Sequence, residues 1–357
     1  MVEFEVGRGC GRATGLTAQR VNEFNQLFAR VEVAKPCGTH KARCASLQST
    51  AYARRINLPS PASRDAEVTV FGANGPLLLD TVRTVIRGLE HSPVRYKYLS
   101  IEDHRALLEA DLAAGVKVQV TELLHHAHFA AAATLARAYQ WAEGCLLAYS
   151  RDLFLPFCAS ARGLLEAVGD SYDGLPRIPL ALAEQKRAIK SALAGTSPPQ
   201  MLNYKEVEDF LLHFAHGKRV DRAQRASAPD YVEAKLPSTY TKPLEARPPG
   251  GFLGRYQELC ELTHPASDSV CYMLVPDAEG RLELHPSVDR ERIQTHVIAH
   301  QARLAELLRI SQVPALVMLK VLLHIGPPEL HVNTVRGIGL RDIRLWQKCA
   351  AALGVSP

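Results

Sequence analysis

The sequence predicts a mainly α-helical protein, a multi-helix bundle with a small β-hairpin inserted in it. Three observations favour this fold class. Apolar residues recur at helical spacing through most of the chain after residue 100. Apolar residues make up 47% of the chain and charged residues 22%, which is typical of a globular protein with a buried core. Two short apolar runs, residues 270–275 and 281–284, flank Pro-Asp-Ala-Glu-Gly and have the pattern of a hairpin.

The N-terminal segment differs from the rest of the chain in composition. Residues 1–65 are rich in Gly, Arg and Ser, so we expect a poorly ordered extension before a single helical domain at residues 66–350. Cys37, His40 and Cys44 offer three metal ligands, but a structural zinc site needs four. The spacing therefore predicts no metal site in the extension.

The first part of the predicted domain has the order strand, glycine turn, helix. Residues 67–71 have the composition of a short strand, residues 72–76 contain two glycines and a proline, and residues 77–89 have helical spacing. This order is typical of a phosphate-binding loop, but the glycine spacings of the known loops are not present. We therefore expect a turn into a helix rather than a nucleotide site.

Amphipathic helices are predicted one after another between residues 100 and 195. Ser100 can cap the first of them through its side chain. The next helix carries an alanine-rich stripe over residues 120–138, which allows a neighbouring helix to approach closely. A third helix is expected to begin near Pro156, and Gly163 within it offers the same close approach.

The last third of the chain combines a linker with further helices. Residues 217–251 contain a basic run and several prolines, and we predict a polar linker there. Such a basic run is usually a solvated surface, with contact to nucleic acid as the alternative. Helices are expected at about residues 288–310, 313–325 and 340–353. The middle one is too short to span a bilayer, so we interpret it as a buried core helix and expect no membrane contact.

Composition also bears on location and partners. The eight cysteines are scattered and lie mostly within apolar helical segments, which is typical of reduced core thiols in a cytosolic protein. The N-terminus does not have the pattern of a secretory signal. We therefore expect a cytoplasmic protein. A net charge of +5 permits contact with a polyanion such as RNA without requiring it.

The clearest local feature is a predicted helix that ends at His264. Tyr256, Cys260 and His264 recur every four residues, so they share one helix face. Pro265 disfavours helical backbone at the residue before it, so the helix is expected to stop at His264. The negative end of the helix dipole favours a protonated imidazole there, as an acid or as a cation that binds phosphate. The alternative is a capping role, in which the ring hydrogen-bonds free carbonyls.

Two other groups of polar residues fall on predicted helices. Arg162 and Glu166 are four residues apart, and such a pair either locks two helices together or holds a guanidinium group ready for phosphate. His125, His126 and His128 have the spacing of metal ligands on a helix, but no acidic motif accompanies them. A polar helix face is therefore the favoured interpretation of the three histidines.

Three segments carry a resemblance to known proteins. Residues 157–166 read Phe-Cys-x-x-x-Arg-Gly-Leu-Leu-Glu, residues 256–265 read Tyr-x-x-Leu-Cys-Glu-x-x-His-Pro, and residues 314–322 read Pro-Ala-Leu-x-x-Leu-Lys-x-Leu. Over about residues 90–350 the chain resembles a group of uncharacterised bacterial helical proteins. That group is similar to HEPN-like bundles, many of which are ribonucleases of toxins and phage-defence systems.

The resemblance implies a helical bundle in which an arginine holds the scissile phosphate and a histidine acts on the 2′-hydroxyl or the leaving oxygen. HEPN ribonucleases place these two residues four to six residues apart on one helix. The chain departs from that pattern around His264. Arg290 and His296, with five residues between them, are an alternative pair, although so loose a pattern arises by chance in a chain with 14 histidines.

These observations lead to one prediction of function and one alternative. We predict that Arg162, Glu166 and His264 are the catalytic residues of a HEPN-like, metal-independent ribonuclease or a phage-defence or toxin-type effector that acts on RNA. No cofactor and no metal ion are predicted, and a homodimer is expected. The alternative is a non-catalytic helical interaction or scaffold protein in which the three residues are structural. A shared site requires the three side chains to converge in space.

Overall fold

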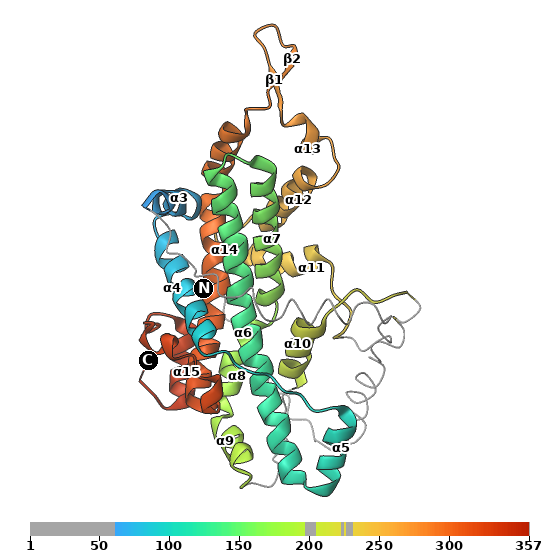
Figure 1. Ribbon diagram of the computed structural model, residues 1–357, viewed down its shortest axis with the longest axis vertical. Helices are drawn as coiled ribbons and strands as arrows, with labels where there is room; N and C mark the ends of the chain where they lie inside the picture. Colours follow the sequence, from blue (N-terminus) through green and yellow to red (C-terminus); the bar gives the residue numbers. More distant parts are fainter. Residues whose placement is uncertain (1–60, 197–204, 223–224, 226–230, 357) are drawn as a thin grey trace.

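The computed structural model describes residues 61–196, 205–222, 225 and 231–356. This part of the chain consists of helices α3 to α15, several short 3-10 turns and one two-stranded hairpin (Figure 1). The predicted fold class, a mainly α bundle with a small hairpin, is confirmed. Most of the predicted N-terminal extension lies outside the described residues, but its last five residues are helical because α3 begins at Pro61.

Two long helices run side by side along the long axis of the molecule (Figure 1). Helix α6 (Leu112–Ser150) has 39 residues and helix α14 (Asp289–Ile325) has 37. At about 1.5 Å per residue each is more than 50 Å long, roughly three times the length of an average helix in a globular protein. Helix α7 (Phe154–Tyr172) follows α6 and packs along both of them. These three helices form the frame to which the other elements attach.

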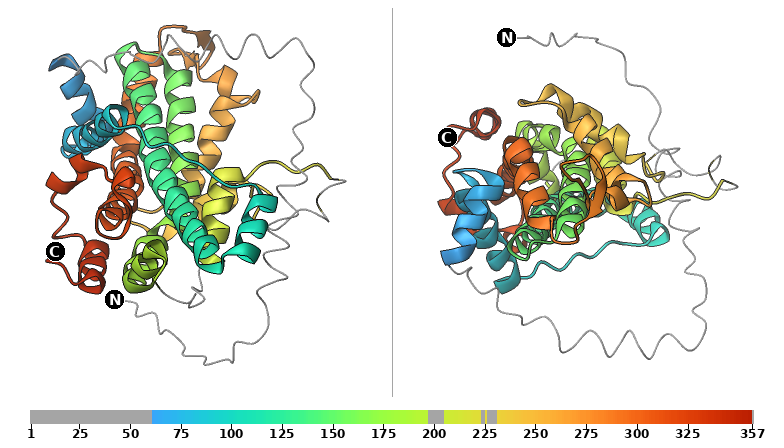
Figure 2. Two further views of the ribbon diagram at one scale, coloured as in Figure 1. Left: turned by 60° about the horizontal axis from the view of Figure 1, so that its bottom comes forward. Right: turned by 90° about the horizontal axis from the view of Figure 1, so that it is seen from above.

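The core has two parts, one at each end of the long helices. One part joins the first half of α6 and the second half of α14 to α8 (Ile178–Glu184), α9 (Lys186–Ala194) and α15 (Arg344–Leu353). The other part joins the remaining halves to α7, α3 and α12 (Phe252–Thr263). Helices α3 and α4 lie on one side of the frame and α12 on the other (Figures 1 and 2). The remaining helices are α4 (Gly75–His91), α5 (Ile101–Ala110), α10 (Lys205–His216), α11 (Pro237–Thr241) and α13 (Asp268–Cys271).

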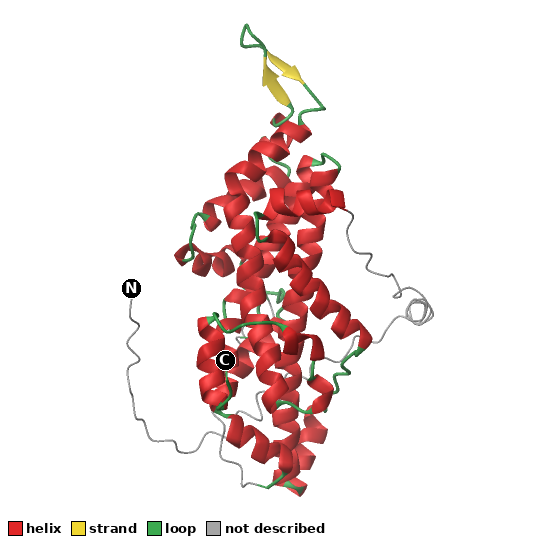
Figure 3. Cartoon of the chain, turned by 90° about the vertical axis from the view of Figure 1, so that its left-hand side faces the viewer, coloured by secondary structure: helices red, strands yellow, loops and turns green. Residues whose placement is uncertain are grey.

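The hairpin stands beyond one end of the bundle (Figures 1 and 3). Strand β1 (Leu274–Pro276) pairs antiparallel with β2 (Leu282–Leu284), with Leu274 opposite Leu284. The predicted hairpin is therefore present, but its first strand is shorter than expected because residues up to 271 belong to α13.

The predicted strand at residues 67–71 is wrong, because this run is the second half of α3 (Pro61–Phe71). Its β-branched residues favour a strand only where a neighbouring strand is available, and here the partners are helices. Val70 and Phe71 are fully buried in the core. The buried carboxylate of Glu67 lies 2.8 Å from the buried guanidinium of Arg83 in α4, which joins the two helices.

The two helices predicted at residues 288–310 and 313–325 are in fact the single helix α14, which continues through Pro314. A proline removes one helical hydrogen bond and usually breaks or kinks a helix. Pro314 is buried within the long core helix, where packing on both sides holds the backbone in place. Among the described residues, α14 alone is long and apolar enough to span a membrane, but 72% of its apolar window is buried inside the protein, as in a core helix.

The predicted linker at residues 217–251 contains ordered structure in its described part. Helix α11 (Pro237–Thr241) and the 3-10 turn η3 (Lys242–Ala246) pack against α7 and α12. Thr241 and Leu244 are fully buried there. This half of the segment is therefore part of the bundle and leads directly into α12.

Candidate functional site

Helix α12 is anchored at both ends by features that its sequence encodes. Before its first turn Gly251 has φ +72°, a left-handed conformation that favours glycine. The carboxylate of Glu245 accepts hydrogen bonds from the backbone N–H groups of Gly251 and Leu253, which satisfies free donors at a helix N-terminus. At the other end Thr263 is the last helical residue and His264 has extended backbone, as Pro265 predicts.

The structure brings the three predicted residues together. Arg162 Nε donates to Glu166 Oε1 over 2.9 Å, and Arg162 Nη1 donates to Thr263 Oγ1 over 2.9 Å. The same Nη1 lies 3.0 Å from His264 Nε2. We name Arg162, Glu166, Thr263 and His264 the Arg162 cluster. It joins α7 to the C-terminal end of α12.

The contact between Arg162 and His264 has one possible direction. A guanidinium group only donates hydrogen bonds, so Nε2 of His264 is the acceptor in this arrangement. The side chain contacts Arg162, and no hydrogen bond from its ring to a backbone carbonyl is found among the described residues.

The Arg162 cluster is open to solvent. The side chains of Arg162 and Glu166 are 22% and 32% exposed, and His264 is exposed. Burial lowers the pKa of Arg162, but its hydrogen bond and ion pair with Glu166 outweigh this and raise the pKa above its ordinary value. The ring centroid of Tyr256 lies 6.0 Å from the Arg162 guanidinium, and burial raises the pKa of its phenol, which stays protonated. The cluster thus offers a permanent cation beside an imidazole nitrogen that accepts a hydrogen bond.

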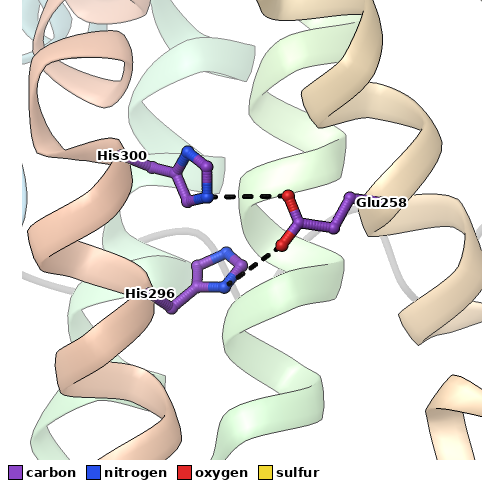
Figure 4. Close-up of side chains that lie close together, drawn as sticks. All are labelled: Glu258, His296 and His300. Carbon is purple, nitrogen blue, oxygen red and sulfur yellow. Dashed lines mark ion pairs between the residues drawn. The ribbon is translucent and has the colours of Figure 1, made fainter.

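A second cluster lies between α12 and α14 (Figure 4). Glu258 Oε1 is 3.9 Å from His296 Nδ1, and Glu258 Oε2 is 3.5 Å from His300 Nε2. We name these three residues the Glu258 cluster. Within the residues that the structure describes, they are the one group of three or more possible metal ligands whose ligand atoms all lie within 4.8 Å of one another.

Sequence analysis did not predict the Glu258 cluster. The one local signal is the spacing His296-x-x-x-His300, which places both rings on one face of a helix. Glu258 is 38 residues away in sequence and its role depends on how α12 packs. The alternative pair of Arg290 and His296 does not form, because Arg290 is exposed while His296 is buried on another side of α14.

Two arginines flank the Glu258 cluster. Arg255, which is only 5% exposed, places Nη1 2.7 Å from Glu258 Oε2. Arg303 Nη1 lies 3.3 Å from His300 Nδ1. Burial, and next the charge of Arg255, lower the pKa of His296 to about 2 and that of His300 to about 4. Both imidazoles are therefore neutral near pH 7.

The three histidines near residue 126 are not a polar helix face, contrary to prediction. His125, His126 and His128 are at most 9% exposed. Residues 92–100 cross over this part of α6, so that the Tyr98 ring stacks on His126 at 4.4 Å and the Tyr96 hydroxyl lies 2.7 Å from His128 Nδ1. Burial lowers the pKa of His126 and of His128 to about 4. Aromatic rings therefore pack against this group, while Nδ1 of His125 and of His126 and Nε2 of His128 have no hydrogen-bond partner among the described residues.

The fold and the two clusters define an all-α protein in which one short helix, α12, carries polar groups toward two neighbouring helices. Comparison of the chain with protein-family models, with curated proteins and with solved structures yields no match.

Proposed function

We propose that the Arg162 cluster is the active site of a metal-independent ribonuclease, the activity that the resemblance to HEPN-like bundles leads us to expect. The observation that carries the proposal is the contact of Arg162 with both Glu166 and His264, at 2.9 Å and 3.0 Å, on an exposed surface. An acid or base and a phosphate-binding cation must lie within reach of one reacting group, and these side chains do so.

Each residue has a distinct role in the proposed reaction. His264 Nε2 takes the proton of a ribose 2′-hydroxyl, whose oxygen attacks the adjacent phosphorus. The bond from phosphorus to the 5′-oxygen breaks, and that oxygen receives a proton through water from the His264 imidazolium. The Nη1 group of Arg162 leaves His264 and donates to the phosphoryl oxygens, where negative charge develops. Glu166 holds Nε and so fixes the plane of the guanidinium. The products are a 2′,3′-cyclic phosphate and a 5′-hydroxyl.

The test uses the purified full chain, an RNA oligonucleotide and EDTA, with mass spectrometry of the product ends. We expect cyclic phosphate ends, and a rate at least about 100-fold lower in His264→Ala, since general base catalysis contributes about 10²–10⁴-fold. Arg162→Lys should lose a similar factor, because an ammonium cannot reproduce the planar fork. RNA that stays intact with the wild-type chain overturns the proposal.

A matched control separates chemistry from surface charge. His285 is an exposed histidine beside the hairpin that lies 3.1 Å from Glu283 and is not part of the Arg162 cluster. His285→Ala should cleave RNA at the wild-type rate. Equal rates for His264→Ala and His285→Ala would show that the cleavage comes from a contaminant.

The second candidate function is a non-catalytic interaction or scaffold role. It is favoured by the bond from Arg162 to Thr263, which ties α7 to α12 and is not required by the chemistry. In this case Arg162→Ala lowers the melting temperature of a chain that never cleaves RNA. RNA as a partner belongs to the first proposal, while homodimer formation and a cytoplasmic location stay predictions.

A further inference from the structure

The Glu258 cluster has the composition of a metal site and is independent of the Arg162 cluster. Its imidazoles both belong to α14, whereas Arg162 and Glu166 belong to α7. Two imidazoles and one carboxylate form a ligand set that zinc accepts, with a fourth position left for water. We propose that Glu258, His296 and His300 bind one Zn²⁺ ion per chain.

The distances within the cluster suit ligands better than hydrogen bonds. An N–H to oxygen hydrogen bond spans about 2.7–3.2 Å. The two contacts of Glu258 span 3.5 Å and 3.9 Å, which is too long. Ligand atoms about 2.1 Å from a tetrahedral zinc ion lie about 3.4 Å from one another. The three ligand atoms lie within 4.8 Å of one another, and Glu258, whose side chain is 46% exposed, can move toward the two rings.

The histidines are held in place before any ion binds. His296 is 94% buried, since its side chain is 6% exposed, and its Nε2 has no hydrogen-bond partner among the described residues. The rings of Phe154 and Phe157 pack against it, with centroids 5.7 Å and 6.0 Å away. The ring packing fixes the orientation of His296, so that Nδ1, which lies 3.9 Å from Glu258 Oε1, is the nitrogen that would bind the ion. His300 lies one turn further along the same helix face.

The proton states and charges are compatible with the proposal. Ligating imidazoles must be neutral, and burial already keeps His296 and His300 in that form. Arg303 donates to His300 Nδ1, so the ring proton now sits on Nε2 and must move to Nδ1. Arg303 keeps its 2.7 Å bond to the Gly250 carbonyl when that contact is released. Arg255 can stay paired with Glu258 Oε2 while Oε1 binds the ion.

The experiment measures zinc binding by the full chain with isothermal titration calorimetry, and zinc content by mass spectrometry after desalting. We expect one Zn²⁺ per chain. His300→Ala should weaken binding by at least about 100-fold, because even outer-shell partners of a metal contribute 10–100-fold. His285→Ala is the matched control and should bind as wild type, since His285 belongs to no group of three possible metal ligands among the described residues.

A second measurement keeps the proposal testable if a variant folds poorly. Co²⁺ in place of Zn²⁺ in the wild-type chain should give the visible absorption bands of a four-coordinate site with nitrogen and oxygen ligands. Absence of those bands, or a wild-type chain that retains no zinc, overturns the proposal. So does zinc binding by folded His300→Ala that equals wild type. Because RNA cleavage is assayed in EDTA, loss of zinc binding and loss of cleavage are separate results.

Discussion

Two groups of histidines lie on the two longest helices and differ in what faces them. His125, His126 and His128 belong to α6, and His296 and His300 belong to α14. Within each group the histidines lie close together on their own helix, and burial lowers the pKa of histidines in both groups. Aromatic rings from residues 92–100 cover the first group, whereas the carboxylate of Glu258 faces the second.

This difference shows that histidine spacing on a helix does not by itself identify a metal site. Tyr96 occupies the Nδ1 nitrogen of His128, and the ring of His126 is covered by Tyr98. Those histidines therefore contribute to packing. On α14 the third ligand comes from another helix, so its presence depends on how α12 packs.

The largest expected effect is that zinc stabilises the folded chain by binding at the α14 histidines and not at the α6 histidines. At a free zinc concentration about 1,000 times the dissociation constant, the free energy of unfolding should rise by about 4 kcal/mol. His126→Phe keeps the stack on Tyr98 and should show the same rise, while His300→Ala should show none. Urea unfolding with and without zinc measures both. If zinc raised the free energy of unfolding of His300→Ala but not that of His126→Phe, the zinc site would belong to the α6 group and not to the α14 group.

The next effect is acid destabilisation, to which the α6 group contributes alongside His296 and His300. Burial, and to a lesser degree His125, lowers the pKa of His128 from 6.5 to about 4. Between these values the unfolded chain binds a proton that the folded chain excludes, so stability is full above pH 6.5 and declines as the pH falls toward 4. The loss from His128 should reach about 3 kcal/mol.

The measurement compares urea unfolding at pH 7 and pH 4, in EDTA, for wild type and His128→Phe. The variant loses the hydrogen bond to Tyr96, so its free energy of unfolding at pH 7 should be lower than that of wild type. Its free energy of unfolding should nevertheless fall less between pH 7 and pH 4. His285→Ala, an exposed histidine, should follow wild type. An unchanged pH dependence in His128→Phe would show that this histidine is not neutral in the folded chain.

The smallest effect concerns the cation beside the α14 group. Arg255 is 5% exposed, and its guanidinium has no well-formed hydrogen bond to any described residue despite the ion pair with Glu258. Arg255→Met should raise the metal-free stability by about 1 kcal/mol, because a buried charge is replaced by an apolar side chain while Glu258 stays solvated.

Arg255→Met should also tighten zinc binding, because a positive charge near the ion is removed. Arg281→Met, at a 74% exposed arginine of the hairpin, is the control and should change neither property. A clear loss of stability in Arg255→Met would show that the ion pair with Glu258 outweighs the cost of burying Arg255.

Features that depend on a few neighbouring residues were predictable from the sequence. Helical periodicity determined the fold class, and Pro265 determined where α12 ends. Gly163 allowed the close approach that was expected there, since a Cβ atom on it would lie 2.5 Å from the Trp141 side chain. The pairing of Arg162 with Glu166 followed from their spacing of four residues.

Only the tertiary structure decided the features that join distant segments. It turned the strand-like residues 67–71 into a helix, kept α14 continuous through Pro314 and buried the histidines of α6. It also placed His264 against Arg162 and Glu258 against His296. The physical reason is that backbone preference acts over a few residues and about 1 kcal/mol, whereas the packing of whole helices involves much larger buried areas and sets which side chains meet.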